Sequence, residues 1–426
     1  MTVRGAAFLG IGAMVGAGIF ALLGEAGKVA GSAVWISFVL AGVVASLLGY
    51  TVVKLGVRYP SSGGLIAYLL EGFGNGRLVG IASWLGYFAA IVIVCSMVAV
   101  SFGGYATSLF IGEHAGGGWD NLFTSAIVLA MVAINLIGAR FVDRAQSAIV
   151  VVLLAVFAVF ICVTLVNINP DLLAFSGYPS FSTIIASVAI TFFAYLGFSV
   201  ITFSVGDLRE PTRELPRAMY AALAVTSLTY VLISLGVFGT LTVHEVVGFG
   251  ATAIAEAARP TLGEAGFTIM AIAALLATAS SVNATLYASS GLTAMLAEVG
   301  QFPPFFGRSS PLGQKSGLLI TAGIVLVVSN LVDLSAIASV GSACSLMIFL
   351  LVGISGYRLR SKTGSRAVII VLAIAATVTV LVFFAIDTLE NAPATFAAIV
   401  SIAALSVTLD LIWKRVRGPD VATSPP

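Results

Sequence analysis

The sequence predicts an all-α polytopic membrane protein with twelve transmembrane helices, from its composition, the lengths of its apolar segments and its charge distribution. Hydrophobic residues make up 59% of the 426 residues and charged residues only 9%, whereas a soluble domain carries about 25% charged residues. A chain this poor in charge cannot cover a water-facing surface, so most of its surface must face membrane lipid. No basic run suggests nucleic acid as a partner.

The apolar segments match the thickness of a bilayer. A hydrocarbon core of about 30 Å needs about 20 apolar residues per helix. The twelve segments of suitable length lie at 5–29, 32–57, 77–111, 121–138, 146–168, 183–206, 217–241, 261–298, 316–332, 335–357, 367–387 and 393–413. Two of them, 77–111 and 261–298, exceed one bilayer thickness, so we expect them to tilt or to extend beyond the membrane.

Lysines and arginines orient these helices. With the amino terminus inside, eighteen of the 20 Lys and Arg residues fall in cytoplasmic loops or helix ends, and only Lys28 and Arg259 fall on the opposite side. Cytoplasmic loops of membrane proteins carry this excess, and a missed or added helix would invert every later loop. We therefore expect a multi-pass protein of the cell (plasma) membrane with both termini in the cytoplasm.

Two spans contain glycine-bearing interruptions. The first carries GIGAMVGAGIF (Gly10–Phe20), and the sixth carries TFFAYLGFS (Thr191–Ser199), where a glycine lies among aromatic residues. Taken singly, each has a simpler explanation. The G-x-x-x-G of Gly12 and Gly16 is typical of close helix packing, and the second stretch suits an aromatic packing face. Because the two lie five helices apart in spans of opposite direction, the pair favours two broken helices and an inverted repeat.

The inverted repeat divides the chain into four parts. We expect a first repeat at 1–168, a second at 183–357, two further helices at 367–413 and a cytoplasmic tail at 414–426. Broken helices at the midplane form a binding site, because half-helix N-termini bind a carboxylate and freed carbonyls bind an ammonium group or a cation. Irregular backbone at this depth is tolerated only where it lines a cavity or is buried in protein.

These motifs resemble those of the amino acid–polyamine–organocation (APC) superfamily of transporters. GIGAMVGAGIF is similar to the first-helix motif of that superfamily, and YPSSGGLIAYL (Tyr59–Leu69) to the loop between its helices two and three. FFAYLGF followed by GDLREPTRELPRAM (Gly206–Met219) resembles the sixth helix and its loop. SVNATLYASSGLTAMLAEVGQFPPFF (Ser281–Phe306) resembles the eighth helix and the loop after it. The motifs cover most of the first ten helices in the right order.

The resemblance implies a leucine-transporter-type fold of two inverted five-helix repeats, with helices 1 and 6 broken, plus two further helices. It implies a prokaryotic-type amino acid permease, a secondary active transporter (symporter or antiporter) that moves amino acids or amines by alternating access. It also implies roles for single residues. The substrate α-carboxylate binds the N–H groups of Gly16, Ala17 and Gly18, the α-ammonium binds the carbonyls of Met14, Phe193, Ala194 and Leu196, and wall or gate positions fall to Tyr195 and Phe198.

Polar residues on three other helices have two interpretations. They line the transport route, or each makes an ordinary helix-packing contact, which is the commoner role of such a residue. They are Ser96 and Ser101 on helix three, Asn283 and Tyr287 on helix eight, and Ser342 on helix ten.

The coupling ion, sodium or proton, stays open. Many relatives carry a lysine in the fifth helix, seven residues after a glutamine, where it takes the place of a sodium ion and is linked to proton coupling. The matching glutamine here is Gln146, which leads to Leu153, and the fifth span contains no lysine. Exchange without coupling is a third option. A candidate sodium site combines carbonyls near Gly10 and Ala13 with the hydroxyls of Ser280 and Ser281, although these serines equally suit bonds to their own helix carbonyls.

The substrate is expected to be a neutral L-amino acid. Ser199 stands where relatives often have an acidic residue, and no carboxylate falls at the centre of a predicted span. A substrate with an extra cation requires such an acid, because an unpaired charge is costly in the membrane. The aromatic residues of the sixth helix suit an apolar side chain, and Ala17, Ser199, Gly341 and Ser342 leave room for it. An amine or polyamine carrier, an exchanger or an exporter of the same fold is the alternative.

Other classes of function have less support. His114 and His244 fall in loops, and Cys95, Cys162 and Cys344 fall in apolar segments without disulfide or metal-ligand spacing. We therefore expect no catalytic residues, no metal site and no cofactor, and an intramembrane enzyme is disfavoured. Paired broken helices favour alternating access over a channel. The charged loop at 207–217 is expected to be solvated rather than gating, and the oligomeric state stays open.

Overall fold

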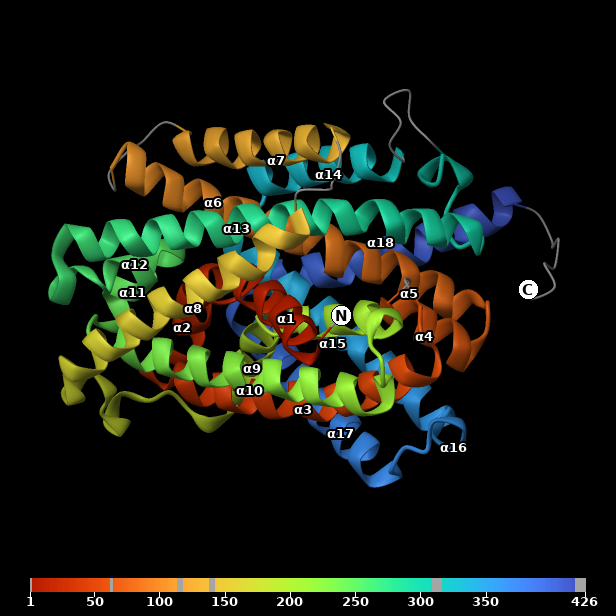
Figure 1. Cartoon of the computed structure of the whole chain (residues 1–426), viewed down its shortest axis with the longest axis horizontal. Helices are drawn as coiled ribbons and strands as arrows, with labels where there is room; N and C mark the ends of the chain where they lie inside the picture. The colour runs from red at the N-terminus through yellow and green to blue at the C-terminus, as the bar shows by residue number, and fades with distance from the viewer. Residues whose placement is uncertain (1, 62–63, 113–117, 138–141, 309–315, 418–426) are drawn as a thin grey trace.

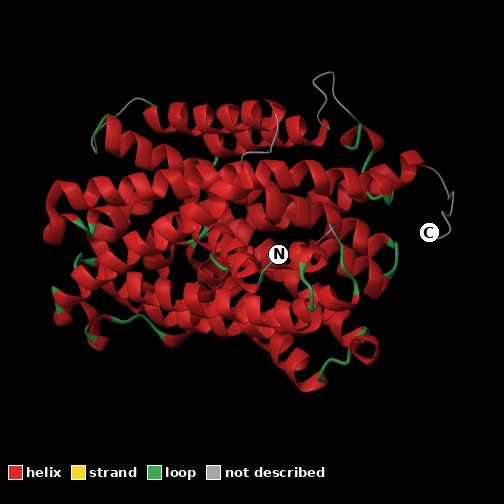
Figure 2. Cartoon of the chain, viewed as in Figure 1, coloured by secondary structure: helices red, strands yellow, loops and turns green. Residues whose placement is uncertain are grey.

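The computed structural model describes residues 2–61, 64–112, 118–137, 142–308 and 316–417. Every regular element in these ranges is helical, and none of them contains a strand (Figure 2). The long helices α3 (Val34–Arg58), α10 (Pro211–Phe238) and α13 (Arg259–Glu298) lie along the long direction of the bundle (Figure 1). The short helices α11 (Val243–Phe249) and α12 (Ala253–Glu256) lie at one end of it, and α4 (Gly64–Phe73) lies at the other.

Helices occur where the sequence predicts spans. Outside the two interrupted spans, the apolar segments fold as α3, α5 (Arg77–Tyr87), the π-helical segment η2 (Phe88–Ile93), α6 (Val94–Phe110), α7 (Trp119–Ile137), α8 (Val142–Val166), α10, α13, α14 (Ser316–Leu331), α15 (Leu334–Arg358), α17 (Ala367–Asn391) and α18 (Pro393–Arg417). The remaining short elements are η1 (Gly31–Ala33), η4 (Pro170–Leu173), η5 (Phe175–Gly177), η7 (Gly250–Thr252), η8 (Pro304–Phe306) and α16 (Arg360–Thr363).

Ten helical segments of the described residues are long and apolar enough to cross a membrane. This number is lower than the predicted twelve for two reasons. The first two predicted spans join into one helical segment, Ile19–Arg58, and α14 is shorter than 18 residues. The structure therefore shows an all-helical protein built from long apolar helices, and the number that crosses the membrane stays a prediction.

The first interrupted span is broken at one residue. Helix α1 (Val3–Ala17) ends just before Gly18, which has φ −103° and ψ −84°, and α2 begins directly after it as Ile19–Ala30. The break falls on the last glycine of the GAMVGAG motif, so Gly16 and Ala17 belong to the last turn of α1.

The second interrupted span is broken over two residues and changes helix type. Helix α9 (Phe181–Phe193) is followed by Ala194 and Tyr195, and the chain then continues as a twelve-residue 3₁₀ helix, η6 (Leu196–Asp207). Hydroxyls of Ser199, Thr202 and Ser204 each donate to the carbonyl three residues back, at 3.1, 2.7 and 2.7 Å. Side-chain bonds of this kind offer carbonyls an alternative to the α-helical pattern. They give a local reason for the long 3₁₀ segment, which is uncommon.

Both breaks lie inside the bundle. Helix α1 contacts η6, α8, α10 and α13. Phe20, at the start of α2, packs against Phe157 of α8 and Tyr105 of α6, with ring centroids 5.3 and 5.8 Å apart. The irregular backbone is thus buried in protein, as a membrane requires. The three cysteines are free, as the sequence predicts.

Candidate functional site

The two breaks meet at Gly18 and Ala194. A Cβ atom placed on Gly18 would lie 2.5 Å from the Tyr230 hydroxyl, 2.6 Å from the Ala194 carbonyl oxygen and 2.7 Å from that of Met14. Two of these three oxygens belong to backbone and cannot move without displacing a helix. Only glycine fits at this junction, and the sequence prediction that the two interruptions form one site is consistent with the contact.

A second glycine joins the other side of the breaks. Gly197, near the start of η6, lies directly on the peptide that joins Ala13 and Met14, with no room for a side chain between them. Gly16 packs against α13, where an added Cβ would lie 2.9 Å from the Ala277 carbonyl oxygen and 3.1 Å from the Cβ of Ser281. Glycines therefore bring α1 into backbone contact with both η6 and α13.

Tyr230 connects the two breaks, and the sequence analysis did not identify it. It lies fully buried on α10, and its hydroxyl donates to the Ala194 carbonyl at 3.2 Å. The same hydroxyl lies beside the first break, 2.5 Å from a Cβ placed on Gly18. One side chain thus contacts the first break and bonds a carbonyl of the second. No motif marks this tyrosine in the span at 217–241, so only the tertiary contacts reveal it.

The position of the first break determines which amides are free of helical bonds. A helix leaves its first N–H groups without intrahelical partners. In this conformation those groups belong to the start of α2, where the amides of Ala21 and Leu22 bond the Gly18 carbonyl at 3.2 and 3.0 Å. Gly16 and Ala17, which the resemblance assigns to the carboxylate, lie in the last turn of α1.

The aromatic residues of the sixth span occupy different surroundings. Tyr195 is buried, donates its hydroxyl to the Phe38 carbonyl of α3 at 3.0 Å and packs edge-on against Tyr230, with centroids 5.2 Å apart. Phe198 packs against Phe349 of α15 at 5.1 Å. The two side chains therefore anchor the second break to neighbouring helices.

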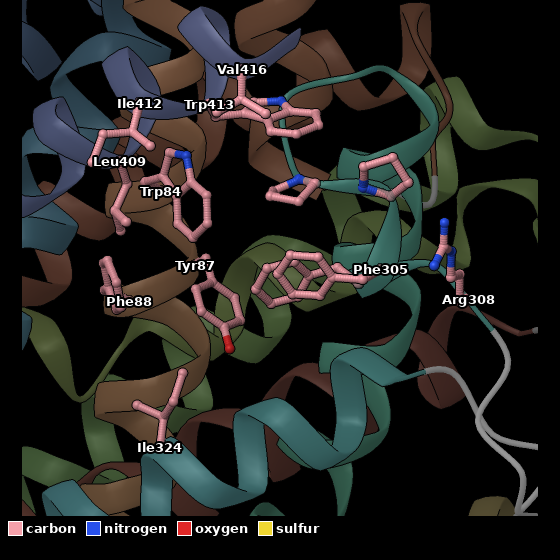
Figure 3. A pocket seen from close by; sticks show the side chains of 13 residues that line it. Trp84, Tyr87, Phe88, Phe305, Arg308, Ile324, Leu409, Ile412, Trp413 and Val416 are labelled. Atoms are coloured by element: carbon pink, nitrogen blue, oxygen red, sulfur yellow. The ribbon is translucent and has the colours of Figure 1, made fainter.

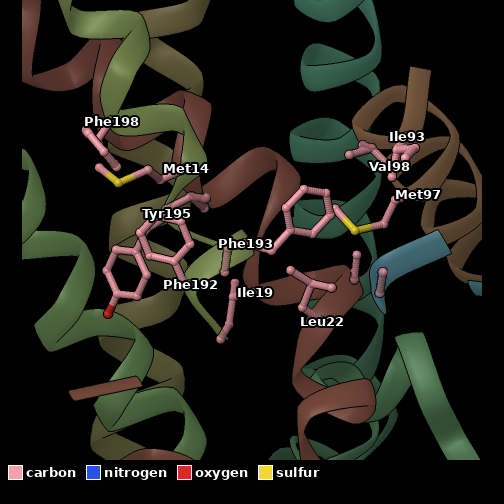
Figure 4. Packing of buried hydrophobic residues seen from close by; sticks show 14 of the residues in the cluster. Met14, Ile19, Leu22, Ile93, Met97, Val98, Phe192, Phe193, Tyr195 and Phe198 are labelled. Atoms are coloured by element: carbon pink, nitrogen blue, oxygen red, sulfur yellow. The ribbon is translucent and has the colours of Figure 1, made fainter. Parts of the chain in front are cut away.

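Phe193 points to the centre of the bundle. In Figure 4 its ring lies beside Met97 of α6, close to Leu22 of α2. A Cβ on Gly341 of α15 would collide with this ring and would lie 2.6 Å from Ile93, the last residue of the π-helical segment η2. We expected Gly341 to leave room for a substrate side chain. In this conformation the room is instead filled by Phe193, because an aromatic ring can reach across to a residue without a side chain.

The candidate sodium-site residues lie on two sides of α1. Gly10 packs against the side chain of Ile201, and the carbonyl of Ala13 lies against Gly197, so both contact η6. Ser281 contacts α1 at Gly16, and Ser280 beside it is half-buried. Leu153, at the position of the superfamily lysine, is buried on α8. The side chain of Gln146 lies outside the described residues, as does that of Ala17.

The polar residues proposed for the route divide into three groups. Asn283 accepts a hydrogen bond from Asn135 of α7 at 2.7 Å, and Ser342 donates to the carbonyl of Ala338 on its own helix at 2.7 Å, so these two make packing contacts. Tyr287 is 61% exposed on the outside of the bundle. Ser96 and Ser101 of α6 are fully buried, and their hydroxyls have no hydrogen-bond partner.

Three buried acids were not identified in the sequence analysis. Glu25 pairs with Lys28 at 2.8 Å, Glu256 with Arg259 at 3.3 Å, and Asp410 with Lys414 at 3.1 Å. Each acid lies three or four residues from its cation near the end of a helix, and within α2 and α18 this spacing places the pair on one helix face. That spacing was the available signal. The pairs compensate the buried charge locally, so none of these acids is left to balance a cationic substrate.

The charged loop before α10 has a structural role. The Glu214 carboxylate accepts hydrogen bonds from the amides of Arg209 and Glu210, at 2.9 and 3.2 Å, where the helix begins. Arg213 and Glu210 form an exposed ion pair at 3.4 Å, and pairs of this kind contribute little to stability. These contacts agree with a solvated loop. His244 is exposed on α11, and His114 lies outside the described residues.

Two broken helices buried in a bundle of long apolar helices, with their ends in contact, are the architecture of a membrane transporter. A family model described as amino acid permease matches residues 2–413. The chain therefore belongs to the amino acid permease family, within the APC superfamily, and is a multi-pass membrane transporter and not an enzyme.

Similar proteins cover most of the chain. The inner membrane transport protein YbaT of Escherichia coli (strain K12) is 30% identical over 96% of this chain and 94% of its own length. The methylthioribose transporter of Bacillus subtilis (strain 168) is 28% identical over 83% of this chain and 79% of its own. The serine/threonine exchanger SteT of the same organism is 26% identical, with coverages of 69% and 67%. The names of the first two relatives state transport and that of the third exchange, and the two Bacillus subtilis names state different substrates.

Proposed function

We propose that this protein is a secondary active transporter of neutral L-amino acids with apolar side chains, and that it works by alternating access across the cytoplasmic membrane. The observation that carries the proposal is the junction of the two breaks, where Gly18 lies against the Ala194 carbonyl and the Tyr230 hydroxyl bonds that carbonyl beside Gly18. An α-amino acid has one anionic and one cationic group on neighbouring atoms. A backbone amide of one break can bind the carboxylate and a backbone carbonyl of the other can bind the ammonium group, so no ionised side chain is needed.

The proposed topology has two inverted five-helix repeats, two further helices and both termini in the cytoplasm. The division of lysines and arginines supports it. The end of the bundle that carries α11 and α12 is then the outer end, and it holds Lys28 and Arg259, each paired with a buried glutamate. The end that carries α4 and α16 is the cytoplasmic end.

Substrate binding requires the two breaks to separate. Gly18 and Gly197 leave no space between the breaks in this conformation, and Met14, Tyr195 and Phe198 are fully buried. We expect η6 to move, because a long 3₁₀ segment has poorer hydrogen-bond geometry than an α-helix and often marks a hinge. Its movement away from α1 opens the junction towards the cytoplasm.

The surroundings of Phe193 favour an apolar substrate side chain. Met97 and Ile93 flank the ring, and Gly341 faces it, so a side chain that displaces the ring meets apolar groups. The buried acids of the described residues are paired with cations near helix ends. An arginine or a polyamine would therefore bring an uncompensated charge to the centre of the bundle, which is costly.

Transport into proteoliposomes tests the proposal. The full chain is reconstituted, and saturable uptake or exchange is measured for leucine, serine, arginine and putrescine. Leucine is expected to be transported best and to compete with the others. Transport of arginine or putrescine in preference to leucine would overturn the substrate class, and absence of transport for all four would overturn the amino acid assignment.

A thermal-shift series addresses coupling. Leucine is added to the purified protein in sodium, in choline and at two pH values. Stabilisation that needs sodium supports an ion site formed by Gly10, Ala13, Ser280 and Ser281, and equal stabilisation in choline contradicts it.

A further inference from the structure

An apolar groove lies on the surface of the bundle, and none of its lining residues belongs to either break. It encloses about 620 Å³, a volume typical of ligand sites. It lies between α5, the turn around η8, α14 and the end of α18 (Figure 3). Its thirteen lining residues are apolar or aromatic apart from Arg308, and they include Trp84, Phe88, Phe305, Ile324 and Trp413.

The groove runs from the membrane surface into the hydrocarbon region of the proposed topology. Trp413 and Val416 lie at one end of it and Ile324 at the other (Figure 3). Val416 is near the cytoplasmic end of α18, whereas Ile324 is eight residues into α14, which corresponds to a depth of about 12 Å. Phe305, Ile412 and Val416 are exposed, so the groove opens sideways towards lipid. A long apolar chain that enters from the bilayer fits this shape.

The polar groups lie where a lipid headgroup would begin. Arg308 is exposed at the groove, and none of the ion pairs among the described residues includes it. Asp410, the nearby buried acid of α18, is paired with Lys414 at 3.1 Å and so does not oppose an anion. The groove therefore presents one uncompensated positive charge at its cytoplasmic side.

Trp84 provides a second, independent observation. Its side chain is 6% exposed, stacks on Phe302 with ring centroids 3.9 Å apart and lines the groove, yet its indole N–H has no hydrogen-bond partner. A buried donor without a partner is costly, and ligands commonly satisfy such groups. Trp84 lies seven residues into α5, which corresponds to about 10 Å from the start of the helix at Arg77. In the proposed orientation its indole N–H therefore lies deeper in the membrane than Arg308.

We propose that the groove binds one anionic phospholipid of the cytoplasmic leaflet. One acyl chain lies along the aromatic wall, an ester oxygen accepts from the Trp84 indole, and the phosphate lies at Arg308. Basic pockets between helices on this side of a membrane bind anionic headgroups, and aromatic residues concentrate at the same level. The proposal is independent of the transported substrate and rests on the proposed orientation of the helices.

The test uses the full chain, purified in detergent and stripped of lipid. Phosphatidylglycerol and phosphatidylcholine with identical acyl chains are titrated, and binding is followed by native mass spectrometry and by thermal stability. One molecule of phosphatidylglycerol is expected to bind per chain, with a higher affinity than phosphatidylcholine. Arg308→Gln is expected to lower the affinity for phosphatidylglycerol about five-fold and to leave the affinity for phosphatidylcholine unchanged. Lys362→Gln, which removes an exposed charge of α16 at the same end, is the matched control and is expected to change neither.

A second variant tests the apolar part. Ile412→Trp fills the groove from an exposed position of α18, so the protein is expected to fold normally. The substitution should lower the affinity for both lipids. Equal phosphatidylglycerol affinity in the wild type, Arg308→Gln and Ile412→Trp would overturn the proposal. A thermal shift with glycerol 1-phosphate as large as that with phosphatidylglycerol would also overturn it, because glycerol 1-phosphate carries the anionic group without the acyl chains. Loss of a dimer in Ile412→Trp without loss of lipid would show that the groove instead binds a second copy of the chain.

Discussion

The two broken spans differ in how they are interrupted. The first is broken at Gly18 alone, and an α-helix continues on both sides. The second is broken over Ala194 and Tyr195, and a twelve-residue 3₁₀ helix follows. A 3₁₀ helix rises about 2.0 Å per residue, against about 1.5 Å in an α-helix, so η6 covers more membrane with fewer residues.

The contacts at the two breaks also differ in kind. The first depends on missing side chains, since Gly16 and Gly18 allow backbone of other helices to approach. The second depends on added hydroxyls, with Tyr195 bonding α3 and Tyr230 bonding Ala194. Substitutions at the glycines where α1 meets its neighbours, Gly197 of η6 included, should therefore act by collision, and those at the tyrosines around the second break by loss of hydrogen bonds. The variants that follow test this difference.

The largest effect is expected for Gly18→Val. The new side chain collides with the carbonyl oxygens of Met14 and Ala194, so the breaks cannot meet. Uptake of leucine into proteoliposomes should fall about a hundredfold or more. Gly104→Val is the control, because open space surrounds that glycine of α6. Uptake by Gly18→Val within two-fold of the wild type would refute the contact between the breaks.

Gly197→Ala is expected to be the next most damaging change. The added methyl group collides with the peptide between Ala13 and Met14, which can move only together with α1. Initial uptake rates should fall about tenfold. Gly206→Ala lies in the same 3₁₀ helix with nothing near its Cβ and should transport normally. Equal uptake rates in the two variants would mean that the contact between η6 and α1 does not limit transport.

Tyr230→Phe removes one hydroxyl and keeps the ring. It leaves the Ala194 carbonyl without this partner, and a hydrogen bond contributes about 1 kcal/mol, so the KM for leucine should rise about five-fold. Tyr87→Phe removes a hydroxyl that bonds Thr321 at 2.9 Å, away from both breaks, and serves as the control. If both variants lose thermal stability but keep the same KM, the role of Tyr230 is only structural.

The smallest effect is expected for Gly10→Ala. Its added methyl group meets the end of the Ile201 side chain, which can change rotamer, and lies 3.4 Å from the Cβ of Ala222. Uptake should stay within about two-fold of the wild type, since overpacking against a flexible side chain costs little. A loss as large as that of Gly197→Ala would show that position along α1 matters more than the rigidity of the neighbour.

Much of the architecture was predictable from local properties of the chain. Hydropathy located the helices, and the opposite directions of GIGAMVGAGIF and FFAYLGF predicted which two spans are broken. The exact place of the first break was not predictable, because four glycines compete in Gly10–Gly18 and their helix propensities are equal. Phe193 shows the same limit. Gly341 was expected to leave room for a substrate side chain, and the Phe193 ring fills that space because α9 and α15 approach closely.

The sequence by itself determined the membrane class, the helical segments, the paired interruptions and the neutral character of the centre. These follow from composition, periodicity and the positions of Lys and Arg, which act locally or through the membrane. Only the tertiary structure decided that Tyr230 bonds Ala194 beside Gly18, that η6 is a 3₁₀ helix lying on α1, and that Trp84 and Arg308 share one groove. The physical reason is that these features arise where backbone and side chains far apart in the sequence come within a few ångströms.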